Sequence, residues 1–264
     1  VPIFVNRDAA YYDRLLGQLN GVLMPGGGSP LLTSRYAHVA DRIIEKAIAI
    51  NRAGHYFPLW ATCLSYEKMI TYFTGNRDLS WETRCQAQDI SLPLDFPAGE
   101  QPTGSRLFRN ASQGIVEVIA NENVTANYHK ICLTVATFEA NANLTANFRL
   151  VSSNTLGGVH FVSTIEHRQY PIYATQWHPE KNQFEWVRRR TLGHINHDAN
   201  AIRVGQYFGN FLVDEARRNN QRFVNETEET NALIYNYPQY VLYSGKTGKS
   251  SFDEIYRFPL DFNN

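Results

Sequence analysis

The sequence lacks several features that would assign it quickly to a broad class of protein. Lysine plus arginine and aspartate plus glutamate each number 25, so the 264-residue chain has no formal net charge. This balance argues against a nucleic-acid-binding protein, which usually shows a basic face. No apolar run is long enough to cross a bilayer, which argues against a membrane protein. The chain shows no signal peptide and starts with valine rather than methionine.

Cysteine is also scarce, with only Cys63, Cys85 and Cys132 in the chain. An odd number leaves at least one thiol free within a monomer. Because there is no Cys-x-x-Cys pair, we expect no structural zinc site and no other metal. A free thiol is either a small buried apolar group or a nucleophile, and the residues around it must distinguish the two.

Enough apolar and aromatic residues are present, 43% and 13%, to bury a sizeable core. Apolar segments of strand length alternate with helical segments at about residues 8–19, 36–53 and 64–73. This alternation predicts an α/β fold, with a mostly parallel central sheet and helices on both faces. Residues 148–178, with a Gly157-Gly158 turn, predict an antiparallel extension, and a last helix is expected at about 199–218. With no repeat or linker, we expect a single domain over residues 1–264. The three apolar segments are Val1–Val5, Gly21–Pro25 and Phe57–Ala61.

Cys63 lies where an apolar strand gives way to a helix, with the small residues Ala61 and Ser65 two positions to either side. A nucleophile elbow needs this layout, since bulky side chains would clash in its sharp turn. The sulfur would then lie at the carboxyl end of the sheet and near a helix N-terminus, whose dipole favours the thiolate. The alternative is an inert buried cysteine.

His178 and Glu180 follow a predicted strand and flank Pro179. In an extended chain residues i and i+2 face the same way, so imidazole and carboxylate can project together. A carboxylate beside an imidazole fixes its tautomer and stabilises the imidazolium, which in turn stabilises a thiolate. The pattern therefore fits a Cys-His-Glu triad, although a surface His-Pro-Glu turn would look the same.

A third element, Gly26-Gly27-Gly28, follows the second apolar segment. Glycines let backbone N–H groups approach a ligand closely, and such groups can stabilise the oxyanion of acyl transfer. We nominate the N–H of Gly27 and that of Leu64, the residue after the thiol. A phosphate cradle is disfavoured because neither a GK[ST] ending nor a GxGxxG pattern is present.

Together these elements resemble the class I glutamine amidotransferase fold, a flavodoxin-like sheet, and within it the γ-glutamyl hydrolase family. The similarity covers nearly the whole chain. Its most specific parts are the Gln-Trp-His-Pro-Glu-Lys stretch and the Thr-Ala-Asn-Tyr-His-Lys stretch. The matching stretches are Gly21–Gly27, Tyr56–Leu64, Leu92–Phe96, Thr125–Lys130, Pro171–Tyr173, Gln176–Lys181 and Asp214–Asn220.

The resemblance implies a cysteine hydrolase that cleaves γ-glutamyl bonds of folylpoly-γ-glutamates through a thioester at Cys63, without a cofactor. It also suggests that Glu67 and His129 lie near the substrate. No nucleic-acid or membrane partner is implied, and a homodimer is one option for the assembly. The family usually has glycine at the positions of Ala61 and Ser65, and a non-glycine residue at a positive φ would cost on the order of 1 kcal/mol.

Two rival functions remain open. A glutaminase subunit that passes ammonia to a synthase would share the triad and would release ammonia from free glutamine. A non-catalytic secreted protein that kept the fold would leave Cys63 unreactive towards iodoacetamide at neutral pH.

Four glycosylation sequons begin at Asn110, Asn123, Asn143 and Asn225. Chance would give about two or three in a chain this rich in asparagine, so they favour a secretory route only weakly. A glycan must lie on the surface, and we therefore predict that these asparagines are exposed. Together with the resemblance, they indicate a lysosomal or secreted glycoprotein.

The start of the chain carries a further expectation. Proteins of the resembled family begin earlier, with a strand and helix that precede the segment matching Val1–Val5. That first strand would lie between Val1–Val5 and Gly21–Met24 in a flavodoxin-like order. We therefore expect the chain to be N-terminally incomplete, with a gap of about two strand spacings, near 10 Å, between these segments.

Overall fold

The computed structural model describes residues 1–99, 101–186, 193–241 and 254–258. Its helices are α1 (Ala9–Leu16), α2 (Arg35–Arg52), α3 (Leu64–Phe73), α4 (Gln113–Asn121), α5 (Val135–Ala140), α6 (Ala142–Asn147), α7 (Lys181–Phe184), α8 (Ala199–Ala216) and α9 (Glu226–Ala232), with 3-10 turns at Pro102–Gly104 and Ile234–Asn236. Its strands are β1 (Val22–Met24), β2 (Leu59–Thr62), β3 (Glu82–Leu92), β4 (Thr125–Leu133), β5 (Phe148–Leu156), β6 (Val159–His167), β7 (Ile172–Thr175), β8 (Gln239–Val241) and β9 (Glu254–Tyr256).

The central sheet has five strands in the order β1-β2-β7-β6-β5. β1, β2 and β7 run parallel, and β6 and β5 continue the sheet in antiparallel fashion. β2 and β7 are buried along their whole length, as expected for strands covered on both faces. The carboxyl ends of β2 and β7 are therefore adjacent, and the polar residues that follow them are brought to one edge of the sheet.

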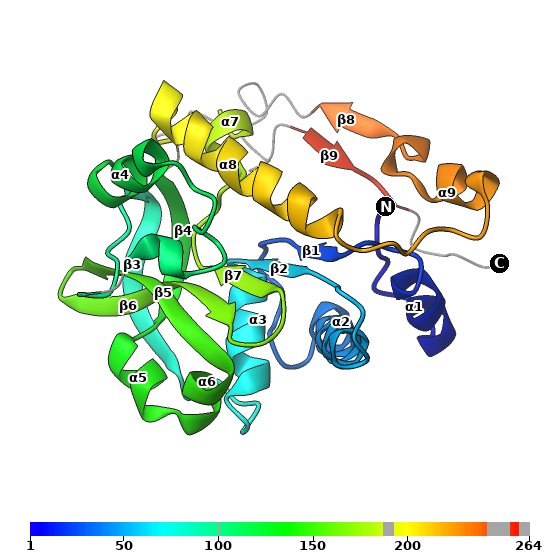
Figure 1. Ribbon diagram of the computed structural model, residues 1–264, viewed down its shortest axis with the longest axis horizontal. Helices are drawn as coiled ribbons and strands as arrows, with labels where there is room; N and C mark the ends of the chain where they lie inside the picture. The colour runs from blue at the N-terminus through cyan, green and yellow to red at the C-terminus, as the bar shows by residue number, and fades with distance from the viewer. Residues whose placement is uncertain (100, 187–192, 242–253, 259–264) are drawn as a thin grey trace.

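Helices cover both faces of the parallel part of the sheet (Figure 1), with α2 and α3 on one side and α8 on the other. Ser34 caps α2 by accepting a hydrogen bond from the N–H of Ala37, and Gly54 follows the helix with a φ of +87°. Asp198 caps α8, which buries residues at helical spacing against Trp60 and Trp177. The buried residues of α8 include Ala201, Val204, Gly205 and Phe208.

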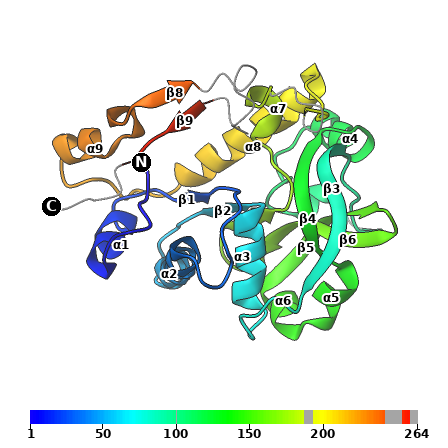
Figure 2. The same ribbon diagram turned by 180° about the vertical axis from the view of Figure 1, so that it is seen from behind.

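The antiparallel part of the molecule, with β3, β4, β5 and β6, lies on the opposite side of α3 from α2 (Figure 2). β3 and β4 form a separate two-stranded ribbon, joined by a disulfide between Cys85 and Cys132. The β5–β6 hairpin turns at Gly157 and Gly158, whose φ angles are +58° and +81°. Two consecutive positive φ angles fit the two-residue hairpin turn that glycine favours, which confirms the predicted turn.

The predicted fold class is confirmed: an α/β protein with a parallel sheet, helices on both faces and an antiparallel extension. The second and third predicted strands and the helices at 36–53, 64–73 and 199–218 are also present, with ends shifted by a few residues. The β3–β4 ribbon was not predicted. Within the described part of the chain, no helix has the length and apolar character needed to span a membrane.

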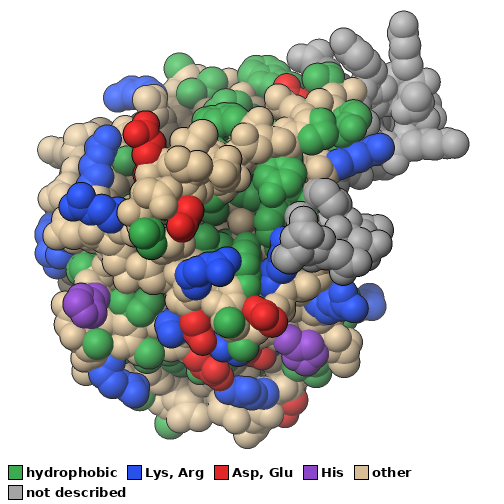
Figure 3. Space-filling view, turned by 90° about the vertical axis from the view of Figure 1, so that its right-hand side faces the viewer, with side chains coloured by type: hydrophobic (Ala, Val, Ile, Leu, Met, Phe, Trp, Pro, Cys, Tyr) green, Lys and Arg blue, Asp and Glu red, His purple; other side chains and the backbone are tan. Residues whose placement is uncertain are grey.

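The prediction of a strand at Val1–Val5 is wrong, because these residues form no strand. Several of them line an apolar cavity of about 610 Å³ beside β1, together with residues of α2 and α8. Figure 3, which views this side of the molecule, shows hydrophobic side chains gathered there. Val1–Val5 does not pair with β1, which is an edge strand of the central sheet, and residues of both segments line the cavity, in keeping with the expected gap. The expected spacing near 10 Å and N-terminal incompleteness stay predictions.

Candidate active site

Cys63 lies between the end of β2 and the first residue of α3 and has a φ of +51° and a ψ of −105°. A positive φ is unfavourable for a residue with a side chain and is found where surrounding structure enforces it. The Cys63 N–H donates to the carbonyl of Thr175 at 2.8 Å, which ties the turn to the end of β7. Cys63 is therefore held in the strained strand-to-helix turn that was predicted for it. Ala61 and Ser65 have no positive φ, so the backbone cost considered for them does not apply.

Cys63 is only 7% exposed, and it is the free cysteine of the chain. Burial is the main cause that raises its pKa, to about 12, and the carboxylates of Glu67 and Glu180 add to the effect. The Leu64 N–H and Lys181 act in the opposite direction but do not outweigh it. The predicted effect of the helix terminus is therefore present, but it is too small to make the resting sulfur of Cys63 a thiolate. Slow reaction with iodoacetamide consequently no longer identifies a non-catalytic protein.

His178 follows β7 by three residues, and its backbone N–H donates to the carbonyl of Ala126 in β4 at 2.8 Å. Its Nδ1 lies 2.6 Å from Oε1 of Glu180. The hydrogen bond and charge of His178 lower the pKa of Glu180, whose side chain is 53% exposed. The ionised Glu180 accepts a hydrogen bond from the Nδ1–H of His178, which leaves Nε2 as the basic nitrogen.

Gly26 is the point at which Cys63 and His178 converge. A Cβ added to Gly26 would lie 2.6 Å from Cε1 of His178, 3.4 Å from its Nε2 and 3.3 Å from Cβ of Cys63. Only a glycine leaves room for both side chains at this position. In the described part of the chain no hydrogen bond joins Cys63 Sγ to His178, and the triad therefore stays a prediction.

Gly27 is the next residue of the loop 25–34, here called the glycine loop, which joins β1 to α2. A Cβ on Gly27 would lie 3.2 Å from Cδ2 of Leu64, whereas one on Gly28 would meet nothing within 4 Å. Gly27 therefore lies next to the side chain of Leu64, the residue that follows the thiol in the chain. This placement is compatible with the two backbone donors nominated from the sequence.

Glu67 lies one helical turn after Cys63 and accepts a hydrogen bond from Nε2 of Gln176 at 3.1 Å. Burial raises the pKa of Glu67 to about 7, with the Gln176 hydrogen bond opposing and Glu82 reinforcing the shift. The carboxyl is thus largely protonated in acid, where it ceases to oppose the Cys63 thiolate. Its predicted role at the substrate is neither supported nor contradicted by these contacts.

His129 is buried in β4, and both ring nitrogens have protein partners. Nε2 lies 3.1 Å from Oδ1 of Asn127, and Nδ1 lies 3.4 and 3.5 Å from the sulfurs of Cys132 and Cys85. Burial lowers the pKa of His129 to about 4, so its ring is neutral at physiological pH. Judged by distance alone, the side chains of Cys85, His129 and Cys132 could bind a metal ion. Both sulfurs, however, belong to the disulfide. A role of His129 in substrate binding stays a prediction.

Two residues near the site were not singled out from the sequence. Tyr128 packs edge-on against the His178 ring at 5.9 Å, and the Lys181 ammonium lies 5.1 Å from the centre of the Tyr128 ring. Tyr128 alternates with Asn127 and His129 along β4, so a known strand would have indicated that it faces away from these two side chains. The proximity of that strand to His178 could not be read from local sequence.

The sequons at Asn110, Asn123, Asn143 and Asn225 all place their asparagine on the surface, as predicted. Nδ2 of Asn143 nevertheless donates to the carbonyl of Thr74 at 3.2 Å and packs against Gly75. A glycan at Asn143 would have to displace this contact. Glycosylation itself stays a prediction at all four positions.

Comparisons with known proteins agree on one family. Residues 1–180 match the model of the family described as Peptidase C26. The chain is 39% identical over 258 residues to "Gamma-glutamyl hydrolase" of Mus musculus, covering 98% of this chain and 78% of that protein. It is 34% identical over 267 residues to "Gamma-glutamyl hydrolase B" of Dictyostelium discoideum, covering 100% of this chain and 74% of the relative.

A solved structure shows a weaker similarity. It is a putative GMP synthase subunit from Thermoplasma acidophilum, with a TM-score of 0.40 and 15% sequence identity over 77% of each chain. A similarity this distant supports no functional conclusion.

Proposed function

The chain belongs to the peptidase C26 family, and from this premise we propose that it hydrolyses γ-glutamyl bonds of folylpoly-γ-glutamates through a thioester at Cys63. One observation carries the proposal. The strained Cys63 and the His178–Glu180 pair follow adjacent parallel strands and meet at Gly26, where no side chain intervenes. The residues proposed as nucleophile, base and orienting carboxylate thus lie at the edge of the sheet where open α/β folds bind ligands, which supports the proposal.

The raised pKa of Cys63 indicates how the first step proceeds. The resting sulfur is a neutral thiol, so its proton must leave as the sulfur attacks the γ-carbonyl carbon. Nε2 of His178 takes that proton, and the imidazolium that forms is stabilised by Glu180. The carbonyl oxygen becomes an oxyanion, for which the N–H groups of Gly27 and Leu64 are the proposed donors.

The second half of the cycle uses the same groups in reverse order. The imidazolium of His178 gives its proton to the leaving nitrogen of the next glutamate, and the carbon–nitrogen bond breaks to leave the thioester. His178 then takes a proton from water, whose oxygen attacks the thioester carbon. Collapse of that intermediate restores the thiol and releases a γ-carboxylate.

The lysosomal or secreted location is part of the same proposal. A disulfide between Cys85 and Cys132 is typical of proteins that fold in an oxidising compartment. The four exposed sequon asparagines are compatible with that route. In an acidic compartment Glu67 is largely protonated, which removes one carboxylate charge that opposes ionisation of Cys63.

The test is a direct assay. Purified protein is incubated with pteroylpenta-γ-glutamate, and the products are identified by mass. We expect shortened pteroylglutamates and free or γ-linked glutamate, with no cleavage of a matched α-linked peptide. Ammonia release from free glutamine without cleavage of the γ-linked substrate would instead indicate a glutaminase, and a protein inactive on both would contradict the proposal.

A further inference from the structure

The glycine loop has little backbone structure of its own. Within the described residues, no backbone–backbone hydrogen bond involves residues 26–29. Three consecutive glycines have many accessible conformations, and holding them in one is entropically costly. A backbone N–H that must meet an oxyanion needs to be fixed to within a fraction of an ångström, so something outside the loop has to fix it.

The first fixed point lies just before the glycines. The Ser65 hydroxyl donates to the Pro25 carbonyl at 2.5 Å and is itself hydrogen-bonded to the hydroxyl of Tyr36, at the start of α2. Ser65 is completely buried. The carbonyl of Pro25 and the N–H of Gly26 share one rigid peptide plane, so this hydrogen bond also sets the direction in which the glycines begin.

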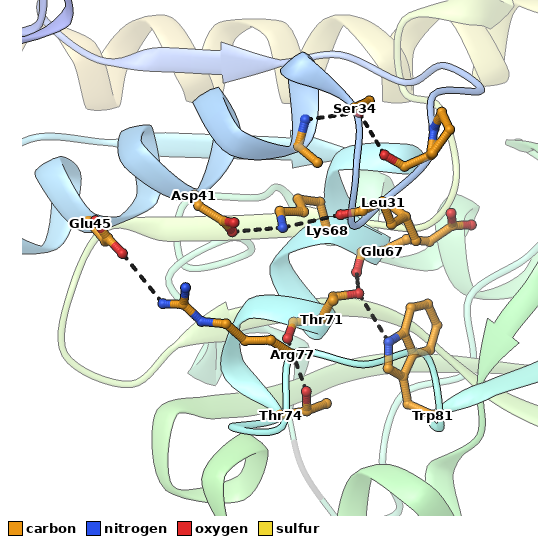
Figure 4. A network of polar contacts seen from close by, with 12 residues as sticks. Leu31, Ser34, Asp41, Glu45, Glu67, Lys68, Thr71, Thr74, Arg77 and Trp81 are labelled. Atoms are coloured by element: carbon orange, nitrogen blue, oxygen red, sulfur yellow. Dashed lines mark hydrogen bonds and ion pairs between the residues drawn. The ribbon is translucent and has the colours of Figure 1, made fainter. Parts of the chain in front are cut away.

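The second fixed point lies just after the glycines. Figure 4 shows Lys68 between Asp41 of α2 and the backbone of Leu31. The Lys68 ammonium donates to the Leu31 carbonyl at 3.2 Å and lies 2.8 Å from Oδ1 of Asp41. The Lys68 side chain is only 4% exposed. Because a buried ion pair contributes little net stability compared with apolar packing, stability alone gives a weak reason for this arrangement.

Both fixed points come from the helix that carries the thiol. Ser65 and Lys68 are three residues apart on α3, so they lie on one face of it. Cys63 begins this helix, and Leu64, the other proposed donor, is its first residue. Any shift of α3 therefore moves the thiol and both ends of the glycine loop together, which preserves the geometry between them.

We propose that Ser65 and Lys68 are positioning residues for γ-glutamyl transfer, which clamp the glycine loop to α3 so that the Gly27 N–H remains aimed at the developing oxyanion. The inference rests on the proposed function. It makes Ser65, at a position where the resembled family usually has glycine, part of the machinery of this chain. Neither residue touches the substrate, and both act through the loop.

The test separates positioning from folding. In Lys68→Met, which keeps the bulk of the side chain but removes its charge, we expect kcat to fall about 10- to 100-fold, because a displaced oxyanion donor costs up to that much. A substrate analogue that ends in a γ-aldehyde should bind more weakly by the same factor, since its adduct with Cys63 places an oxygen at the oxyanion position. Binding of the intact substrate, measured by pteroyl fluorescence in a Cys63→Ala background, should change less than two-fold.

Figure 4 also provides the matched control. Arg77, just beyond α3, pairs with Glu45 of α2 at 3.4 Å, so Glu45→Gln breaks an ion pair in the same region without touching the glycine loop. Its kcat should equal that of the parent. If Lys68→Met does not fold, Ser65→Ala tests the other end of the loop with the same measurements, and it should lose more activity than Tyr36→Phe, which keeps the Ser65–Pro25 bond.

Three results would overturn the proposal: an unchanged kcat in folded Lys68→Met or Ser65→Ala, an equal loss in Glu45→Gln, or a loss of substrate binding that accounts for the loss of rate. An unmodified protein that does not cleave γ-glutamyl bonds would instead refute the proposed function itself.

Discussion

The parallel and the antiparallel parts of the molecule are stabilised in different ways. In the parallel part, the residues after β2 and β7 occupy a strained turn and a close approach at Gly26, and a free thiol is kept buried among carboxylates. In the antiparallel part, long strands pair over many residues, and a disulfide joins β3 to β4. The two parts meet where the N–H of His178 donates to Ala126 of β4. Positive φ angles at non-glycine residues also occur at Arg77 and at Asp89 of β3, but the one at Cys63 lies where chemistry is proposed, and the disulfide lies in the part that supports it.

The sharpest test of this division removes the reactive groups of the parallel part. Cys63→Ala should abolish hydrolysis, and His178→Ala should lower kcat about as severely, on the order of 10⁴-fold or more, because nucleophile and base act as a unit. Neither change should weaken the fold, since the positive φ at residue 63 is a local cost rather than a source of stability. Steady-state rates and thermal unfolding of the same preparations check both points. Substantial hydrolysis by Cys63→Ala would contradict the proposed mechanism.

A graded effect is expected along the glycine loop. Gly26→Ala places a methyl 2.6 Å from His178 Cε1, so kcat should fall about 100-fold from a displacement of the imidazole on the order of 1 Å. Gly27→Ala, whose methyl meets only the tip of Leu64 at 3.2 Å, should lose about 10-fold or less. Gly28→Ala is the matched control and should behave as the parent, since its methyl meets nothing. None of the three glycines has a positive φ, so backbone strain does not contribute to the differences between the three alanine variants. An order of effects other than 26, 27, 28 would contradict the geometry of the site.

In the antiparallel part, removing the covalent link should affect stability more than rate. The double variant Cys85→Ala/Cys132→Ala opens a loop with a sequence separation of 47 residues and should lose about 2–4 kcal/mol of unfolding free energy. Its kcat at a temperature where it is still folded should change by a few-fold at most, because Cys63, His178 and Glu180 lie outside the ribbon. Denaturant unfolding gives the first quantity and an assay at low temperature gives the second. A loss of kcat comparable to that of Gly26→Ala would show that the ribbon takes part directly in the site.

The smallest expected effect is a pH dependence that originates in the parallel part. The pKa of Glu67 is raised by burial to about 7, from an ordinary value of 4.5. Its contribution to stability is therefore complete below about pH 4.5 and is lost as the pH rises through 7, where the folded protein must ionise a buried carboxyl. Glu67→Gln should show a smaller loss of unfolding free energy between pH 5 and pH 8 than the parent. Equal losses in the two proteins would mean that Glu67 titrates normally.

The sequence predicted the parallel part better than the antiparallel part, for a physical reason. β1, β2, α2 and α3 follow one another closely, and their apolar spacing and the turn at Cys63 are local signals. The β3–β4 ribbon joins residues 82–92 to residues 125–133, and nothing local in either segment specifies that pairing. For the same reason the proximity of Tyr128 to His178, and the pairing of Cys85 with Cys132, emerged only from the structure.

One local prediction failed because of packing, and the effect named in another is present but outweighed by packing. Val1–Val5 has the composition of a strand, but no hydrogen-bonding partner strand lies beside it among the described residues, and a strand alone is unstable. The helix terminus at Leu64 does favour the Cys63 thiolate, but burial opposes it and the carboxylates of Glu67 and Glu180 add to that opposition. The helix dipole near Cys63 can be inferred directly from the sequence, whereas the desolvation of its sulfur depends on every element packed around it.

The raised pKa of Cys63 also bears on how long the protein keeps working. Peroxides and disulfide-bearing small molecules attack thiolates far faster than thiols, and an exposed thiolate in an oxidising fluid is soon capped or over-oxidised. Cys63 is only 7% exposed and its sulfur holds its proton at rest, so it is a poor target for either. The same burial that would require His178 to act as a base in the proposed mechanism thus protects this unpaired cysteine from oxidation, in a chain whose other two cysteines are joined as a disulfide.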